Sequence, residues 1–432
     1  MRRTALLVVL AILIGSLTAQ AAPAGTAGPD PMPGTGGTAG PEGMAGSGGN
    51  VSPAVTAGSV GTTGASAPSA PDTLSDAPLA GCAHGAWQHI VGPDQPITVL
   101  AGAPNFDRVL AGTVSADRAE NGLWSGRLVD DIFAPVAEFK EKRLTDAVIG
   151  PPLSGDTTRA WVSLFDMGGI WGSAVGSSQS FGQRGTLAGW VMHLAASDGA
   201  VFAAASKTDG PRGVYRWDPA GGGRWDLKST TPISLTNRPG EPYFRTLAAS
   251  PSGSVLWLGT EDAGLWKSTD GGVIWREVWP SDTALEQSSV QTLTVDPRNA
   301  ERAYVGLGRP GNPAHFSGAL GLRVVDGGTT SAYFTDTDQL SAIEVSKRAS
   351  ATVYVGLYGI DGLRVSDDGG SSWRKLVEAS PEPDYIMSLL DLVPQANPSC
   401  ELLFAGTIDG LWVRNVNMPI RQIFVPVLYR NY

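Results

Sequence analysis

Residues 268–275 read STDGGVIW, and residues 366–373 read SDDGGSSW. Both stretches fit the pattern S-x-D-x-G-x-x-W. Short Ser and Asp side chains hydrogen-bond the backbone of their own turn, Gly supplies the positive φ of a tight hairpin, and Trp packs between sheets. A calcium loop needs more oxygen ligands at alternating positions than this pattern offers. We therefore interpret both stretches as structural hairpins rather than as metal or catalytic sites. The residues concerned are Ser268, Asp270, Gly272, Trp275, Ser366, Asp368, Gly370 and Trp373.

The two hairpins belong to a longer internal repeat. A triplet of Gly, an apolar residue and an aromatic or arginine residue recurs seven times, at intervals of 41 to 57 residues. Each triplet follows a β-rich run such as VLWLGT or TVYVGL, and a further apolar stretch that ends in a turn precedes several of these runs. Four strands per repeat, with turn residues at the junctions, indicate a β-propeller blade. The triplets occupy 122–124, 169–171, 213–215, 264–266, 321–323, 362–364 and 410–412.

Seven triplets predict an all-β fold, a single seven-bladed β-propeller of four-stranded blades. The last triplet, in GLWVRNVN at 410–417, is not followed by a Gly-Gly turn and a Trp strand. A matching Trp strand, HGAWQHI at 84–90, stands ahead of the first repeat. We expect this N-terminal strand to complete the last blade and close the ring, which removes an open sheet edge.

The chain contains two cysteines, Cys82 and Cys400. In the closed ring both lie in turns of the seventh blade, and both turns lie on the same face. A disulfide is permitted in an exported chain. We therefore expect a Cys82–Cys400 bond, and the alternative is two unrelated thiols.

The S-x-D-x-G-x-x-W motif is that of the Asp-box, or bacterial neuraminidase repeat. The chain from 85 to about 415 resembles the Asp-box propellers, a superfamily that includes sialidases, sortilin-type receptor domains, xyloglucan-degrading enzymes and photosystem II assembly factors. VVDGGTTSAY at 324–333 and RWDPAGGGRW at 216–225 resemble diverged copies of the motif. The resemblance implies that the boxes lie on the face opposite the active site.

The two ends of the chain differ from the repeat region. Residues 1–21 combine two arginines, an apolar run and Ala19-Gln20-Ala21, the three zones of a signal peptide, by either the general or the twin-arginine route. Residues 22–80 are almost entirely Gly, Ala, Pro, Ser and Thr, which predicts a disordered linker before a propeller at 81–417. The apolar tail at 418–432 resembles short surface-sorting tails, or forms an extra strand over the last blade. We expect a secreted protein, extracellular or associated with the cell surface.

Charge and composition exclude several classes of partner. The formal net charge is −10 without a Lys/Arg cluster, which disfavours nucleic acids and anionic membranes. No stretch after the leader approaches the ~20 apolar residues of a transmembrane helix. The four histidines are too scattered for a metal site or a catalytic triad, and no motif predicts a metal or a cofactor. His193, in an apolar strand, is interpreted as a core residue, and we expect a monomer.

Candidate binding residues lie in the loops of the face opposite the boxes. Glu261, Asp262, Asp361 and Asp409 stand in short turns and could form an acidic ring around the channel mouth, although Asp-Gly pairs also suit plain hairpin turns. A longer loop at 308–320 carries Arg309, His315 and Phe316. A second insertion at 172–189 carries Phe181 and Arg184. Long loops on a rigid scaffold are the usual place for binding groups.

The sequence favours binding over catalysis. Of the sialidase motifs, the chain offers only Tyr243-Phe244-Arg245, in the middle of the sequence. No carboxylate pair is singled out for glycoside hydrolysis. Our leading hypothesis is an exported, non-catalytic propeller that binds a protein or a polysaccharide through its loop face. The alternatives are a glycoside hydrolase of the Asp-box superfamily and an assembly factor for an extracytoplasmic complex.

Overall fold

A computed structural model describes most of the repeat region. The described residues are Cys82, 85–128, 132–165, 169–174, 180–187, 190–206, 213–229, 244–261, 263–279, 288–308, 319–333, 340–349, 351–359, 362–376 and 382–417. The expected signal peptide (1–21), linker (22–80, together with residue 81) and tail (418–432) lie outside the described residues.

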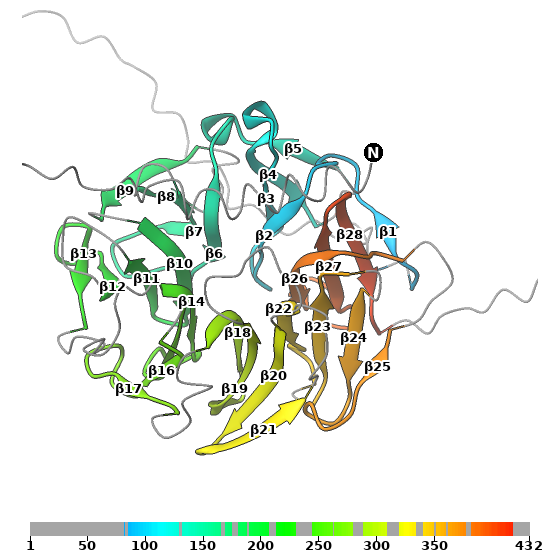
Figure 1. Ribbon diagram of the computed structural model, residues 1–432. Helices are drawn as coiled ribbons and strands as arrows, with labels where there is room; N and C mark the ends of the chain where they lie inside the picture. Colours follow the sequence, from blue (N-terminus) through cyan, green and yellow to red (C-terminus); the bar gives the residue numbers. More distant parts are fainter. Residues whose placement is uncertain are drawn as a thin grey trace, which may run out of the picture.

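The described strands form seven four-stranded antiparallel sheets arranged in a ring, which confirms the seven-bladed β-propeller (Figure 1). The innermost strands are β2 (Ile97–Ala101), β6 (Leu144–Ile149), β10 (Trp190–Ser197), β14 (Phe244–Ala249), β18 (Ser289–Asp296), β22 (Leu340–Val345) and β26 (Ile386–Leu392). The second strands are β3 (Arg108–Thr113), β7 (Thr158–Leu164), β11 (Ala200–Ser206), β15 (Leu256–Thr260), β19 (Asn299–Gly308), β23 (Val353–Leu357) and β27 (Leu402–Thr407).

The two outer layers complete the blades. The third strands are β4 (Gly122–Arg127), β8 (Gly169–Ala174), β12 (Gly213–Asp218), β16 (Leu265–Ser268), β20 (Ala319–Asp326), β24 (Leu363–Ser366) and β28 (Gly410–Asn415). The outermost strands are β5 (Phe133–Pro135), β9 (Gly182–Thr186), β13 (Arg224–Leu227), β17 (Arg276–Glu277), β21 (Thr329–Tyr333), β25 (Arg374–Lys375) and β1 (Gln88–His89). Two short 3-10 helices, η2 (Arg118–Glu120) and η3 (Ala137–Phe139), flank the third and fourth strands of the first blade. We number the blades 1 to 7 from β2–β5 to the blade that contains β26, β27, β28 and β1.

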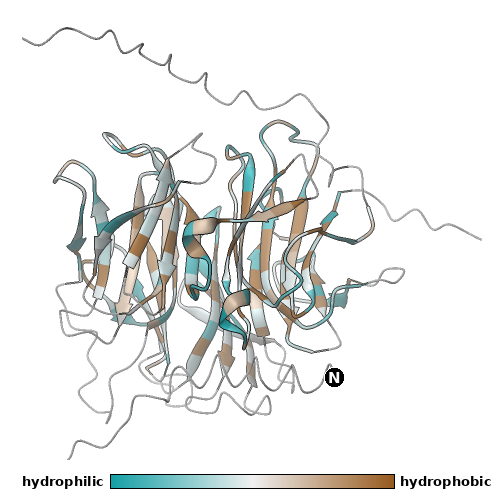
Figure 2. Ribbon diagram, turned by 90° about the horizontal axis from the view of Figure 1, so that it is seen from above, coloured by the Kyte–Doolittle hydropathy of each residue, from teal (hydrophilic) through white to brown (hydrophobic). Residues whose placement is uncertain are grey.

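The core lies between the blades. The central residues of each second strand are buried because neighbouring blades cover both faces of its sheet, and β15, β23 and β27 are buried at every residue. The described residues form seven hydrophobic clusters, each of which joins two adjacent blades. In the view from the side of the ring, hydrophobic residues lie mainly on the strands (Figure 2). The ring is therefore stabilised chiefly by burial of apolar surface between sheets.

The N-terminal strand closes the ring, as the repeat pattern predicts. β1 pairs antiparallel with β28, with Gln88 opposite Val413 and His89 opposite Trp412. Trp87, just before β1, is 5% exposed in the cluster between blades 6 and 7. Blade 7 therefore contains strands from both ends of the repeat region.

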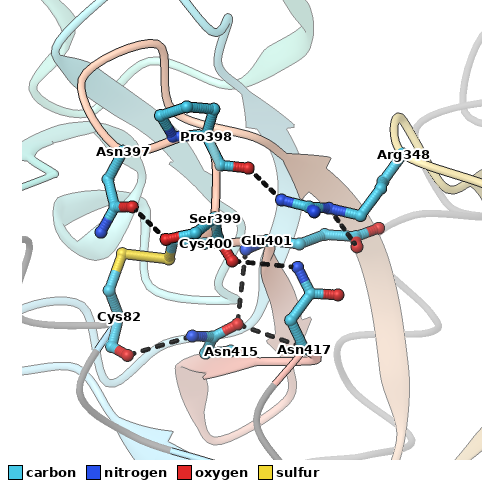
Figure 3. The surroundings of a disulfide bond; sticks show 9 residues. All are labelled: Cys82, Arg348, Asn397, Pro398, Ser399, Cys400, Glu401, Asn415 and Asn417. Atoms are coloured by element: carbon cyan, nitrogen blue, oxygen red, sulfur yellow. Dashed lines mark hydrogen bonds and ion pairs between the residues drawn. A yellow bond between two sulfur atoms is a disulfide. The ribbon is translucent and has the colours of Figure 1, made fainter.

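A disulfide joins Cys82 to Cys400 beside this junction, with a Cα–Cα distance of 5.6 Å (Figure 3). Cys400 ends the turn between β26 and β27, on the same face as the segment that leads into β1. The Nδ2 group of Asn415 donates a hydrogen bond to the carbonyl of Cys82 at 3.0 Å. The covalent bond and this hydrogen bond hold the N-terminal segment against the end of β28.

The two S-x-D-x-G-x-x-W stretches are the hairpins between the third and fourth strands of blades 4 and 6. In blade 6, the Ser366 hydroxyl accepts a hydrogen bond from the Gly370 N–H at 2.8 Å and donates one to Asp368 at 2.7 Å. The same carboxylate accepts from Ser372, and these hydrogen bonds lower the pKa of Asp368 to about 2. Gly370 has a φ of 96°, and the Trp373 indole donates to its carbonyl at 2.9 Å. The box carboxylate is thus fully engaged by its own turn.

A repeated glycine in the second strand sets how closely adjacent blades approach. A Cβ on Gly259 would lie 2.4 Å from Val290 of blade 5, and one on Gly356 would lie 2.4 Å from Ile386 of blade 7. In each case the contact is the residue just before a β-bulge in the innermost strand of the next blade. A Cβ on Gly112, Gly306 or Gly406 would lie nearest to an atom of its own blade, but it would also come within 3.2 Å of the residue before the next bulge, which is Leu144, Leu340 and Ile97, respectively.

Candidate functional site

The topology separates two faces. Each innermost strand begins on the face that carries the turns between second and third strands, and this is the loop face. The turns after the first and third strands lie on the other face, the box face, together with the two box hairpins and the disulfide. The innermost strands surround the centre of the ring (Figure 1).

Every innermost strand has a register shift near its start, after its first or second paired residue. The shifts fall between residues 97/99, 144/146, 191/193, 244/246, 290/292, 340/342 and 386/388. A bulged residue is left out of the strand ladder, and bulges often re-aim a side chain beside a functional site. The seven bulged residues, which we call the channel-mouth ring, are all partly exposed. They are Thr98, Thr145, Met192, Arg245, Gln291, Ser341 and Met387.

Two ring hydroxyls also connect neighbouring blades. Thr145 donates a hydrogen bond to the carbonyl of Val191 at 2.6 Å, and Ser341 donates to the carbonyl of Ile386. Both acceptors are the residues just before the next bulge. These ring positions are therefore fixed relative to each other across the blade boundary.

Arg245 is the one cationic member of the ring. Its Nη1 group donates a hydrogen bond to the carboxylate of Glu261, which follows β15. The side chains of Arg245 and Glu261 are 27% and 21% exposed. Glu261 therefore lies at the loop face in an ion pair, which gives the channel mouth a paired cation and carboxylate.

The structure corrects the assignment of His193 to the core. Its side chain is 33% exposed, and Nδ1 lies 3.0 Å from Oδ2 of Asp146 on the neighbouring blade. The same carboxylate accepts hydrogen bonds from the N–H groups of Ala147 and Leu194, each at 2.8 Å. Asp146 directly follows the bulged Thr145, and His193 directly follows the bulged Met192. The two bulges therefore bring a histidine and an aspartate together beside the ring. The residues that flank His193 in the sequence gave no signal for this pair, because Asp146 lies 47 positions away.

Two tyrosines form an aromatic pair on the loop face of blades 6 and 7. The ring centroids of Tyr358 and Tyr385 are 5.8 Å apart in an edge-to-face arrangement. Tyr385 precedes the bulge at Met387 and has a φ of 51°, a conformation that is uncommon for a bulky residue and recurs at functional sites. Its N–H donates to the carbonyl of Gly359 at 3.0 Å, which fixes the two loops together. Burial, with a contribution from Tyr385, raises the pKa of Tyr358.

Other residues expected at the loop face are placed only in part. Asp409 is exposed in the turn between β27 and β28, where its carbonyl lies 3.0 Å from Nε2 of His89. Asp262, Asp361, Arg309, His315 and Phe316 lie outside the described residues, so the acidic ring remains an expectation.

The described part of the insertion at 172–189 does not open toward the loop face. It forms the end of β8 and all of β9, and β8 ends and β9 begins on the box face. Phe181 is 9% exposed and packs edge-to-face on Phe139 at 4.9 Å. The expectation that this insertion, which carries Phe181 and Arg184, belongs to the loop face was therefore wrong, because β8 and β9 are third and fourth strands.

Neither a cluster of metal-binding side chains nor a membrane-spanning helix occurs among the described residues. In that part of the chain, no group of three or more His, Cys, Asp or Glu side chains could hold a metal ion. None of the helices among these residues has the length and apolar character to cross a membrane.

A buried carboxylate lies on the box face. Asp391, in β26, is 1% exposed, and its Oδ2 accepts a hydrogen bond from the Lys347 N–H at 2.6 Å. Its Oδ1 has no hydrogen-bond partner among the described residues. Burial, together with the neighbouring carboxylates of Glu401 and Glu344, raises the pKa of Asp391 to about 8, against the lowering effects of the Lys347 N–H and side chain.

This carboxyl predicts a pH dependence of stability. The folded state holds the proton up to about pH 8, whereas an unfolded aspartate releases it near pH 4, so the folded state binds more protons between these values. We expect this group to lower the free energy of unfolding by roughly 2 kcal/mol as the pH rises from 5.5 to 7. Urea unfolding of wild type and Asp391→Asn across this range measures the effect, because the variant removes the titration. Parallel pH profiles for the two proteins would contradict the assignment.

Comparisons with known proteins identify relatives of the fold. No family model matches the chain. A 78-residue segment is 38% identical to the oligoxyloglucan-reducing end-specific xyloglucanase of Emericella nidulans, and it covers 17% of this chain and 10% of that protein. The chain therefore aligns with only a small part of that relative.

Three solved structures share the fold over most of the chain. The GH74 xyloglucanase of Xanthomonas campestris aligns with a TM-score of 0.57 at 13% identity, over 78% of this chain and 55% of that chain. The GH74 enzyme of Niastella koreensis gives a TM-score of 0.54 at 14% identity, over 77% and 54%. YCF48 bound to D1 peptide gives 0.53 at 14% identity, over 76% and 96%. This chain spans about half the length of the two enzymes, and at these identities the alignments show the fold.

Proposed function

We propose that this protein is an exported, non-catalytic propeller of the Asp-box type that binds a polysaccharide through its loop face. The observation that carries the proposal is the composition of the channel mouth. Beside the bulged ring lie an edge-to-face tyrosine pair, the Arg245–Glu261 pair and the His193–Asp146 pair. Aromatic faces with a few fixed polar groups are typical of ligand sites that recognise partly apolar, hydroxyl-rich surfaces.

The pairing of the described carboxylates favours binding over hydrolysis. Glycoside hydrolysis needs two carboxyl groups about 5 to 10 Å apart across the sugar, one of them protonated. At the described channel mouth, Glu261 is ion-paired with Arg245, and Asp146 accepts two backbone hydrogen bonds beside His193. Both carboxylates are therefore already occupied by protein groups, which leaves neither of them free to face a glycosidic bond.

A screen of the full chain on a glycan array and on glycosidase substrates tests the proposal. We expect binding to at least one polysaccharide without turnover. Turnover of a xyloglucan oligosaccharide that is lost in Asp146→Asn or Glu261→Gln would replace the proposal by the second candidate, a glycoside hydrolase, which the partial xyloglucanase similarity supports. Binding only to a peptide or protein would favour the assembly-factor alternative, for which the fold of YCF48 bound to D1 peptide is the precedent.

The tyrosine pair provides a residue-level test. We expect Tyr358→Ala and Tyr385→Ala each to weaken binding of the polysaccharide about tenfold, because aromatic anchors contribute disproportionately to binding free energy. Leu227→Ala is a matched control, since Leu227 is 37% exposed on the outer strand β13 and distant in the topology from the channel mouth. Isothermal titration calorimetry on the three variants decides the matter. An equal loss in Leu227→Ala would place the binding surface elsewhere.

A further inference from the structure

A second site is suggested on the box face, between blades 6 and 7. A cavity of about 190 Å³ lies there, lined in part by the turn between β22 and β23 and by the end of β28. The charged side chains that line it are three arginines and two carboxylates, Arg348, Arg374, Arg414, Asp367 and Glu401. The cavity is on the opposite face from the channel mouth and is independent of the proposed polysaccharide site.

Arg414 is the unusual member of this set. Arg414 pairs with Leu403 across β27 and β28, and Leu403 lies three residues before Gly406. Ser366 has the same position in blade 6, opposite Val353 and three residues before Gly356. Arg414 therefore replaces the box serine in the one blade whose last two strands are not joined by a hairpin.

The Arg414 guanidinium is buried, and it carries its charge in surroundings that disfavour it. The residue is 4% exposed, and its guanidinium carbon lies 5.9 Å from the centre of the Trp87 ring. Burial, together with the nearby Arg374, lowers the pKa of Arg414 to about 10, although Tyr354 acts in the opposite direction. The group is still a cation at neutral pH, and an anion beside it would reduce the cost of its burial.

The two carboxylates of the cavity already have partners. Glu401 accepts a hydrogen bond from the Ser346 hydroxyl, and its Oε2 lies 3.6 Å from Nε of Arg348. Asp367 pairs with Arg374 at 2.9 Å, but both side chains are more than half exposed. Exposed ion pairs of this kind contribute little, so Arg374 can turn to a competing anion at small cost.

A second cavity in the propeller serves as an internal comparison. This cavity has a volume of about 270 Å³ and lies at the equivalent boundary between blades 4 and 5. In it, Trp257 takes the place of Tyr354, and Arg276 takes that of Arg374. Val325 takes the place of Arg414, because it pairs with Ala303 and Ala303 lies three residues before Gly306. The positive and negative charges that line this cavity are equal in number. They are Lys267 and Arg276 on one side, and Asp270 and Glu277 on the other. The excess of positive charge in the cavity between blades 6 and 7 is therefore absent from the equivalent cavity between blades 4 and 5.

We propose that the cavity between blades 6 and 7 binds a small oxyanion, a carboxylate, sulfate or phosphate group, between Arg374 and Arg414. Guanidinium groups match the planar or tetrahedral oxygen arrangement of such anions and bind them through paired hydrogen bonds. Inorganic ions and the acidic group of a uronic or sulfated sugar share this chemistry.

Calorimetric titration of the full chain with sodium sulfate, sodium phosphate and sodium glucuronate tests the proposal, with sodium chloride at matched ionic strength as the reference. We expect saturable binding of at least one oxyanion, at least tenfold weaker in Arg374→Gln and tighter in Asp367→Asn. A preference for glucuronate over the inorganic ions would indicate an acidic sugar as the ligand, and the reverse preference a free inorganic ion.

The equivalent blade boundary supplies the control. Arg276→Gln removes the same charge from the cavity between blades 4 and 5 and is expected to leave the affinity unchanged. The proposal is overturned if no oxyanion binds beyond the chloride reference, or if Arg276→Gln weakens binding as much as Arg374→Gln. The second outcome would indicate a general effect of net charge. Because Arg374 is more than half exposed, its replacement tests the site without disturbing the core.

Discussion

Reduction of the Cys82–Cys400 bond should lower the free energy of unfolding by about 5 kcal/mol, the largest effect of any single change considered for this protein. The bond joins residues 318 positions apart, so it closes a loop that includes almost the whole propeller. A cross-link of this span restricts the unfolded chain far more than the folded one, in which both cysteines are held in place. The junction it protects has only two paired residues in β1.

Guanidinium unfolding with and without reductant measures this effect. The double variant Cys82→Ser/Cys400→Ser is the matched control, because its unfolding should not respond to reductant and should match that of the reduced wild type. Hydrogen exchange at Gln88 and Ile90 adds a local readout, since the Ile90 N–H donates to the Leu411 carbonyl at 2.8 Å across the junction. Equal midpoints for oxidised and reduced wild type would show that non-covalent contacts alone close the ring.

The second large effect is expected at Gly406. A Cβ at this position would lie 2.3 Å from Oγ of Ser388, 2.7 Å from the carbonyl oxygen of Ile97 and 2.8 Å from the Cβ of Ile97. Ile97 belongs to blade 1, so a larger residue would separate the first and last blades. We expect Gly406→Val to cost more than about 3 kcal/mol, because the backbone oxygen of Ile97 has little freedom to move in a packed core.

Gly182→Val is the control for this substitution. Gly182 also lies in a strand, but no atom outside its neighbours would lie within 4 Å of its Cβ. Its replacement should change stability by no more than about 0.5 kcal/mol. Chemical denaturation of both variants tests the contrast, and a similar loss at the two positions would mean that strand propensity, rather than blade packing, explains the glycine.

The sequence predicted the architecture because the architecture repeats. The triplets and the two box hairpins recur in phase, so seven blades and closure by the segment at 84–90 follow from counting, and the sheets confirm both. The recurring glycine of the second strand is visible in the β-rich runs that precede the triplets, such as VLWLGT and TVYVGL. The reason that glycine is needed there lies in a contact with the next blade. A contact of this kind depends on three-dimensional approach, which no local pattern expresses.

The site was predicted less well. Turn residues such as Glu261 and Asp409 were identified because short acidic turns are evident in the sequence, and Glu261 then proved to pair with Arg245. The His193–Asp146 pair was missed because a bulge changes which face a side chain takes, and the alternation of polar and apolar residues does not reveal a bulge. The tyrosine pair combines residues of two different loops, and neither loop has a distinguishing motif.

At each of the seven bulges, one residue of the innermost strand packs against the preceding blade and the next residue is partly exposed at the channel mouth. The residue before each bulge is buried against the preceding blade, as at Val290 and Ile386, whereas the bulged residue has no partner opposite it in the ladder. Substitution at a bulged position therefore leaves the strand ladder intact, and only at Thr145 and Ser341 does it also remove a described hydrogen bond to the next blade. The channel-mouth ring can accordingly diverge or be redesigned with the strand ladders unchanged, and two propellers with the same framework can acquire different ligands by changes confined to this ring.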